Sequence, residues 1–199
     1  TSGRTSACDF PPDVRRVPVV GGYGDPSLEM LLAVRPTVVL YADLADKMLA
    51  NRLQERGIRT RWIPCTRLAD IPAAIAAVGE EAGCRETGDR MAAALRAEIA
   101  AVRAETGDAA RPRVLALLWD APLYAVGRQS FVSELIALAG GDNLGDRVDR
   151  PYFQASPEWV IESDPDAIFC LFHIPSEKAV ARLRATPAFA ALTAVRQGR

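Results

Sequence analysis

The sequence has few of the residues on which most catalytic and metal-binding sites depend. Its 199 residues include one histidine and four cysteines, and no two cysteines form a CxxC motif. Cys8, Cys65, Cys84 and Cys170 are too widely spaced for a common zinc or redox motif, and both buried thiols and disulfides stay open. The motifs GxGxxG, GxxxxGK[ST] and GxSxG are absent. We therefore expect no catalytic residue, no metal site and no cofactor, and a single histidine makes a Ser-His-Asp triad implausible.

The sequence also lacks an excess of either charge and a long hydrophobic run. The formal net charge is −1, which provides no basic field for nucleic acid. No apolar run reaches the roughly 18 residues of a membrane-spanning helix. Residues 1–4 are not a signal peptide, so the targeting segment of an exported protein would lie outside this numbering. With 49% hydrophobic and 25% charged residues, the composition is that of a globular domain.

Short apolar segments alternate with helical patterns along the chain. Strands are predicted at residues 17–20, 38–41, 61–63, 114–118, 123–126 and 167–171. Helices are predicted near residues 26–34, 45–56, 69–82, 130–139, 157–163 and 176–185. This alternation favours an α/β fold with mostly parallel sheets.

One further helix, predicted over residues 85–105, is longer than the others. A single apolar stripe runs along it, formed by Met91, Leu95, Ile99 and Val102. A helix of this length is about 30 Å long. We interpret it as a rigid spine between two lobes, with an N-terminal lobe at 1–84, the interlobe helix at 85–111 and a C-terminal lobe at 112–199. The alternative is a long helix packed on one continuous sheet.

The two predicted lobes share a spaced pattern. Tyr23, Glu29 and Pro36 recur 129 residues later as Tyr152, Glu158 and Pro165. Asp25 and Ser156 are each followed by proline and are predicted to be N-caps. Each glutamate then falls in a first helical turn, where the helix dipole favours a carboxylate. The shared offset predicts a pseudo-symmetric pair of lobes, although such a loop, helix and strand succession is common in α/β proteins.

Six segments, taken in order, resemble a known family. They are residues 6–12, 18–22, 27–29, 138–143, 154–158 and 164–168. Their order and spacing resemble the helical-backbone (class III) periplasmic substrate-binding proteins of ABC importers, and the vitamin B12- and ferric-siderophore-binding type in particular. The resemblance implies two Rossmann-like lobes joined by one long backbone helix, with limited lobe motion and a ligand cleft between the lobes.

The resemblance also implies roles for individual residues. Ligand-contacting aromatic positions of the family match Tyr23, Tyr124 and Tyr152, and permease-docking positions match Glu29 and Glu158. The expected ligand is cobalamin, a related corrinoid, haem or a ferric siderophore, and the expected partner is an ABC transporter permease. We expect a periplasmic or otherwise extracytoplasmic monomer, with a lipid anchor as an open alternative.

The sequence departs from the family pattern at three places. The family's first strand and helix would precede Gly3, and its last strand and helix would follow Arg199, so we expect N- and C-terminal elements to be missing. Ala7 stands where the family has an aromatic ligand contact, which leaves the identity of the chelate open.

Two other aromatic residues are candidates for the ligand site. Trp119 lies just after a predicted strand, where loops that line a cleft are expected, and Phe153 neighbours Tyr152. For both, packing in the core is an equally good alternative. Trp62 and Trp159 are expected to be core residues.

Three further features have a plain and a functional interpretation. His173 follows a predicted strand and could bind a haem iron or a corrinoid cobalt, but a surface histidine is the favoured interpretation. Arg128 could meet an anionic ligand group or be a solvated loop charge. Gly140–Gly141 is expected to end a helix. One histidine also argues against the zinc and manganese receptors of this superfamily.

A competing hypothesis is an intracellular α/β enzyme, such as a nucleotide- or sugar-handling transferase. Fold class alone does not separate it from a receptor. The missing phosphate-binding motif disfavours the enzyme, as does the repeated glutamate, which a catalytic site does not need on both lobes. A third hypothesis is a receptor-derived fragment that binds nothing.

Overall fold

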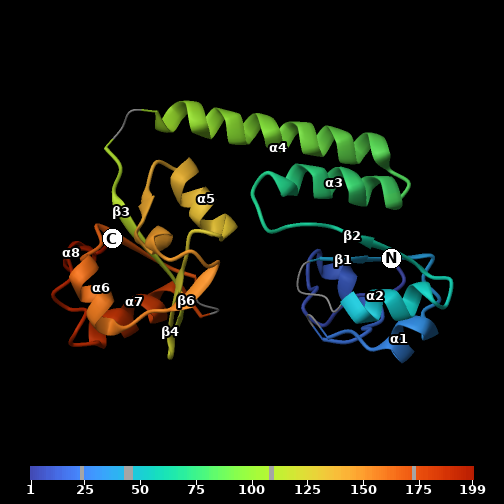
Figure 1. Ribbon diagram of the computed structural model, residues 1–199, viewed down its shortest axis with the longest axis horizontal. Helices are drawn as coiled ribbons and strands as arrows, with labels where there is room; N and C mark the ends of the chain where they lie inside the picture. Colours follow the sequence, from blue (N-terminus) through green and yellow to red (C-terminus); the bar gives the residue numbers. More distant parts are fainter. Residues whose placement is uncertain (23–24, 43–46, 108–109, 172–173) are drawn as a thin grey trace. The chain divides into compact units, whose positions relative to one another are not determined.

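The structure is a computed structural model that describes residues 1–22, 25–42, 47–107, 110–171 and 174–199. Its internal contacts divide the chain into two compact units (Figure 1). Unit 1 contains residues 1–65 and 69–92, and unit 2 contains residues 66–68 and 93–199. Both units combine strands and helices, which confirms the α/β fold class. The division at 1–84, 85–111 and 112–199 stays a prediction.

Unit 1 is built on two parallel strands joined by a helix. Strand β1 (Val38–Tyr41) pairs with β2 (Arg59–Trp62), and the connecting helix is α2 (Lys47–Gln54). A 3-10 turn, η1 (Pro12–Arg16), and helix α1 (Leu28–Ala33) precede them. The core of the unit is a small apolar cluster of Val20, Leu28, Leu31 and Leu53. Burial of these side chains is what fixes α1 and α2 against the strands.

Two expectations for unit 1 are wrong. Residues 17–20 form only an isolated bridge between Val19 and Arg4 and not a strand. Pro18 lies within this segment and has no N–H with which to extend a ladder. Trp62, expected in the core, has an exposed fraction of 53%.

The predicted long helix is confirmed as α4 (Arg85–Thr106), which follows α3 (Asp70–Glu81). The two helices approach each other at Gly79 and Gly88, where a Cβ on Gly79 would lie 2.8 Å from the Gly88 Cα. Contrary to the predicted apolar stripe, the buried residues of α4 are Gly88 and Ala92, whereas Met91 is exposed. Small residues, and not large apolar ones, therefore form this helix contact.

Unit 2 is organised around one central strand, β3 (Arg113–Asp120). Strand β4 (Leu123–Val126) pairs with β3 in antiparallel orientation. Strands β5 (Asp142–Asn143) and β7 (Ala167–Cys170) pair with β3 in parallel orientation. Strand β6 (Tyr152–Gln154) pairs with β4 in antiparallel orientation. The expectation of mostly parallel sheets is therefore met only in part in unit 2, where β5 and β7 pair in parallel and the short turn between β3 and β4 joins antiparallel strands.

Helices cover both faces of this sheet. One core cluster includes Leu115, Leu117, Ala125 and Val160, and contains residues from α6 (Pro157–Ser163) and α7 (Ser176–Ala185). We call this side of the sheet face A. A second cluster joins Val114, Ala116 and Val126 to Ile136 of α5 (Phe131–Leu138), and we call that side face B. The last helix, α8 (Thr193–Gln197), is held by Asp164, whose carboxylate accepts from the Thr193 N–H and hydroxyl at 2.7 and 2.8 Å.

A buried polar network holds the end of β4. The Asn143 amide donates to the Val126 carbonyl at 3.2 Å and to the Asp146 carboxylate at 2.8 Å, and the Ser133 hydroxyl also donates to Asp146. Gly145, in the 3-10 turn η2 (Leu144–Arg147), lies directly against Val126. Gly140 ends α5 with a φ of 82°, so the predicted helix end at Gly140–Gly141 is confirmed.

Two statements about the chain follow from the described residues alone. None of their helices has both the length and the apolar character needed to cross a membrane. The four cysteines are thiols and not disulfides.

Replacing Gly145 by alanine should destabilise unit 2. A Cβ at this position would lie 1.9 Å from the Val126 carbonyl oxygen, so the backbone has to shift. We expect G145A to lower the free energy of unfolding by about 1–3 kcal/mol in a denaturant titration. G107A is the matched control, because the nearest atom to its Cβ would be 3.9 Å away. Equal stability of the two variants would contradict the packing described here.

Candidate functional site

Three of the predicted ligand-contacting aromatic residues lie on the same side of the unit 2 sheet. Trp119 on β3 is directly opposite Tyr124 on β4. Tyr124 is in turn opposite Gln154 on β6, and Tyr152 lies two residues before Gln154 and opposite Val126. Because alternate residues of a strand share a side, Trp119, Tyr124 and Tyr152 all lie on face B. We call these three residues the aromatic face.

The aromatic face is left open by the helix that covers the rest of face B. Helix α5 packs on Val114, Ala116 and Val126, which are all buried. Trp119, Tyr124 and Tyr152 have exposed fractions of 48%, 38% and 40%. Several exposed aromatic side chains on adjacent strands provide a large apolar surface with hydroxyl groups at its edge.

The fourth aromatic candidate in this unit, Phe153, lies on the other side of the sheet. It is opposite Ala125 on face A and packs against the core cluster there. Its ring meets that of Trp159 edge-on, with centroids 5.4 Å apart and an interplanar angle of 84°. Core packing, the alternative left open for Phe153, is thus what the structure shows, and the core position expected for Trp159 is confirmed.

Phe169 on β7 is an aromatic residue of face B that the sequence analysis did not single out. It is opposite Ala116 and has an exposed fraction of 53%. The segment 167–171 is an almost continuous apolar run, and such a run carries no alternation from which its exposed side could be predicted.

Three predicted residues have other outcomes. Tyr23 and His173 lie outside the described residues, so their roles stay predictions. The Arg128 guanidinium forms an ion pair with Asp149, at 3.3 Å from Nε to Oδ1, and both side chains are exposed. This arrangement agrees with the solvated loop charge that was the plainer interpretation of Arg128.

Glu29 lies in the first turn of α1, held by the residue that caps the helix. The N-cap is Ser27 and not Asp25, because the helix begins only at Leu28. The Ser27 hydroxyl oxygen accepts from the Met30 N–H at 3.3 Å and its O–H donates to Glu29 Oε2 at 2.9 Å. Pro26, expected at the first helical position, instead forms a bridge with Gly21.

Glu158 has the corresponding position in α6. Ser156 is the N-cap, as predicted, and its hydroxyl accepts from the Trp159 N–H at 3.2 Å. Ser27 and Ser156 are themselves 129 residues apart, so the serine is a better match to the repeat than Asp25. The offset also relates β1 to β7, whose first residues are Val38 and Ala167.

The pKa values of both glutamates are lowered for the same reasons. The largest cause is a hydrogen bond that each carboxylate accepts from the backbone, and the next is one that it accepts from the capping serine. Both bonds favour the charged form, so the pKa of Glu29 and the pKa of Glu158 lie below the ordinary value. Each group stabilises the fold above its unfolded pKa, and this stability is lost as the pH falls through the folded pKa. At neutral pH both units therefore present an ionised carboxylate at a helix start.

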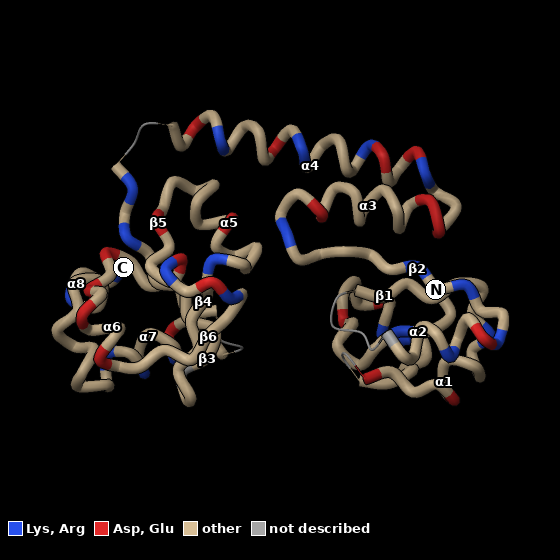
Figure 2. Tube along the Cα trace, viewed as in Figure 1, with Lys and Arg blue, Asp and Glu red and all other residues tan. Residues whose placement is uncertain are grey.

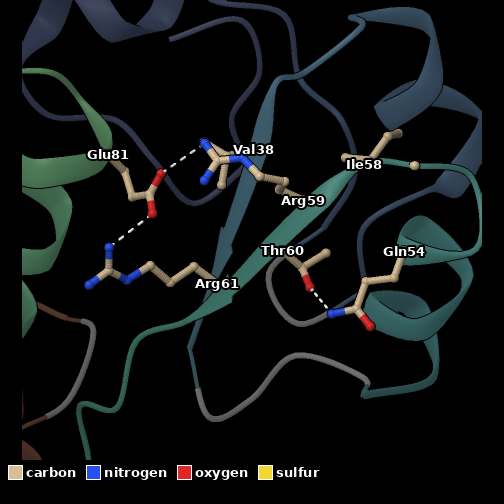
Figure 3. A pocket seen from close by; sticks show the side chains of 8 residues that line it. Val38, Gln54, Ile58, Arg59, Thr60, Arg61 and Glu81 are labelled. Atoms are coloured by element: carbon tan, nitrogen blue, oxygen red, sulfur yellow. Dashed lines mark hydrogen bonds and ion pairs between the residues drawn. The ribbon is translucent and has the colours of Figure 1, made fainter.

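A polar groove of about 530 Å³ lies beside β2 in unit 1 (Figure 3). Its charged side chains are turned toward one another: Glu81 accepts from Arg59 at 3.2 Å and from Arg61 at 2.9 Å. Gln54 donates to Thr60 at 2.6 Å. None of the predicted site residues lines the groove. The polar side chains named here are hydrogen-bonded to one another, so they do not point to a ligand.

The charges of the chain are mixed in sign. Lysine and arginine residues lie interspersed with aspartate and glutamate along α4 and over both units (Figure 2). Within the described ranges, no group of three or more His, Cys, Asp or Glu is placed to hold a metal ion. The aromatic face is a candidate site for a ligand bound by shape and apolar contact.

Removing the capping serines should raise the pKa of the two glutamates. We expect S27A to raise the pKa of Glu29, and S156A that of Glu158, because each loses its serine hydrogen bond. Carboxyl chemical shifts followed by NMR over a pH titration measure both values. S130A, which removes the N-cap of α5, is the control and should leave both pKa values where they are. Unchanged values in S27A and S156A would show that the backbone alone sets them.

Known proteins resemble this chain over most of its length. A vitamin B12-binding protein of Salmonella typhi is 26% identical over 167 residues, which are 83% of this chain and 63% of that protein. For the vitamin B12-binding protein of Vibrio vulnificus (strain YJ016) the identity is 27%, over 83% of this chain and 61% of that protein. The chain thus spans less than two thirds of the length of these relatives.

Solved structures show the same fold. The periplasmic heme-binding protein RhuT from Roseiflexus sp. RS-1, in apo form, matches with a TM-score of 0.85 and 28% identity, over 100% of this chain and 78% of that chain. The periplasmic vitamin B12-binding protein BtuF of Vibrio cholerae matches with a TM-score of 0.84 and 22% identity, over 99% of this chain and 76% of that chain.

A family model described as periplasmic binding protein matches residues 1–199. The family consists of binding proteins, which supports the expectation that the chain is not an enzyme and leaves the transferase hypothesis without support. The chain belongs to the periplasmic binding protein family.

Proposed function

We propose that the chain is the ligand-binding body of an extracytoplasmic solute receptor that serves an ABC importer. Its ligand is cobalamin, a related corrinoid, haem or another ferric chelate, and it delivers this ligand to the membrane permease. The observation that carries the proposal is the aromatic face, where Trp119, Tyr124 and Tyr152 lie exposed on three adjacent strands.

The aromatic face suits a large ligand with an apolar surface. Aromatic rings bury much area for little loss of side-chain entropy, and the two tyrosines add hydroxyl groups that can orient a polar edge of the ligand. The strands hold all three side chains, so the surface exists before the ligand arrives and little binding energy is spent on ordering it. The names of the relatives, which bind vitamin B12 or heme, agree with a ligand of this kind.

The two helix-start glutamates suit recognition by a permease. Glu29 and Glu158 are ionised and lie in equivalent turns of α1 and α6. Carboxylates held in this way can accept bidentate hydrogen bonds from arginine. Single exposed ion pairs contribute little to affinity, so docking depends on both glutamates and on electrostatic steering of the encounter.

Removing the tyrosines of the aromatic face should weaken ligand binding. We expect Y124A/Y152A to weaken binding of the cognate chelate by about tenfold or more, because two ring contacts are lost. Isothermal titration with cyanocobalamin, haemin and a set of ferric siderophores measures the affinities. M91A removes an exposed apolar side chain on α4 and should leave them unchanged. Wild-type affinity in a folded double variant would refute the role of the face.

Neutralising both glutamates should separate uptake from binding. We expect E29Q/E158Q in the complete native receptor to bind ligand as the wild type does, yet to support uptake about tenfold more slowly, because the permease contacts lose both charges. Uptake of labelled ligand by cells that carry the native importer provides the measurement, and E55Q, a substitution in the α2–β2 connection, is the control. A normal uptake rate would exclude the two carboxylates from docking.

A further inference from the structure

The pairing of β3 with β4 contains one irregularity, and it decides where Trp119 points. Leu117 is opposite Ala125, but the next pair is Trp119 with Tyr124, so Leu118 is an extra residue on β3. In an uninterrupted ladder, Leu118 would be opposite Tyr124, and Trp119 would be opposite Leu123. Leu123 belongs to the face A core. The β-bulge at Leu118 therefore moves Trp119 from the core side of the sheet to the aromatic face.

This placement works against stability. An indole on face A would be buried with Leu117 and Leu123, whereas Trp119 is 48% exposed on face B. Large aromatic side chains contribute most to a fold when they are buried. A bulge that brings such a side chain to the surface is a feature expected next to a binding site, where it re-aims a side chain, rather than in the scaffold.

The indole is also held in one orientation, with its polar atom occupied. Trp119 Nε1 donates to the Ala121 carbonyl, two residues further along the chain, at 3.0 Å. Indole has no other donor and no acceptor. A ligand that binds at Trp119 therefore contacts only the flat π surface and the hydrocarbon edge of the ring. Its neighbours on the face, Tyr124 and Tyr152, are also aromatic.

We propose that Trp119 is the specificity-determining residue of the aromatic face, and that it selects ligands with a flat, conjugated macrocycle. This inference rests on the proposed function. A conjugated macrocycle can lie on the indole with both planes in full contact, which buries a large area at low entropic cost. A ferric complex wrapped in hydroxamate or catecholate groups offers no such plane, and neither does a ring whose faces carry axial ligands and out-of-plane amide groups.

The test compares two macrocycles that differ in this respect. Metal-free protoporphyrin IX has an unobstructed conjugated plane and needs no metal ligand from the protein, and cyanocobalamin has both faces obstructed. We expect the wild-type chain to bind protoporphyrin IX the more tightly, by isothermal titration. W119L, which keeps apolar bulk but removes the ring, should weaken protoporphyrin IX binding by about tenfold and cyanocobalamin binding by a clearly smaller factor.

Two further variants keep the result interpretable. W119F retains a ring without the N–H, so it should keep most of the preference for protoporphyrin IX. W159F alters the tryptophan of the face A core, and should leave the preference intact provided that its melting temperature shows it to be folded. Loss of the preference in W119L alone supports the inference.

The unfavourable outcomes are distinct from one another. If W119L lowers affinity for both ligands by the same factor, or for neither, Trp119 does not determine specificity and the inference is overturned while the receptor proposal stands. Tight binding of a ferric siderophore, with none of protoporphyrin IX, has the same meaning. If the wild type binds none of these ligands saturably, the proposed function itself fails.

Discussion

The hydrogen-bonded ladder of β3 is the constraint on which the rest of unit 2 depends. Its central residues Leu115, Ala116 and Leu117 are fully buried, since core clusters cover both sides of the strand. One edge of β3 pairs with β7 and the other with β4, so its register is fixed from both sides. An extra residue at Leu118 cannot be absorbed by sliding either partner. It is taken up locally instead, by turning Trp119 to the side of Tyr124.

The same local structure at the start and end of a helix occurs twice in the chain. In α1 and α6 a serine caps the helix, a glutamate follows in the first turn, and a proline follows within three residues of the helix end. The residue before that proline is left-handed in both cases, Arg35 with a φ of 47° and Asp164 with a φ of 34°. Such a conformation is costly for residues other than glycine, and for Asp164 the hydrogen bonds to Thr193 offset part of that cost. The 129-residue offset therefore relates the start of each helix and the approach to the following strand, and it also relates two buried core residues, Leu31 and Val160.

Most elements of the fold could be predicted from the sequence, but the side on which their residues lie could not. The predicted helices at residues 157–163 and 176–185 are confirmed, although a serine side chain caps only the first. The aromatic residues show the limit. For Trp119 and Phe153 the sequence leaves core packing and the ligand site equally open, and the structure places the two residues on opposite sides of the sheet. The apolar run of β3 has no alternation from which to read its sides, because both are buried, and a bulge leaves no signature in such a run. The proline after Asp25 predicts an N-cap there, but Pro26 forms a bridge with Gly21 and the helix begins only at Leu28.

The features assigned to ligand recognition and to docking depend on different kinds of interaction, and this makes them independent. The aromatic face is set by strand register, so its composition changes whenever a strand residue of face B is replaced. The positions of Glu29 and Glu158 are set by hydrogen bonds within single turns of α1 and α6, which involve no residue of that face. A change of ligand chemistry on face B need not alter the charge of either helix start. In the proposed receptor, one importer could thus keep its docking contacts while the ligand preference of the receptor changes, since the bulge at Leu118 places Trp119 on face B and leaves Leu117 and Leu123 in the core on face A.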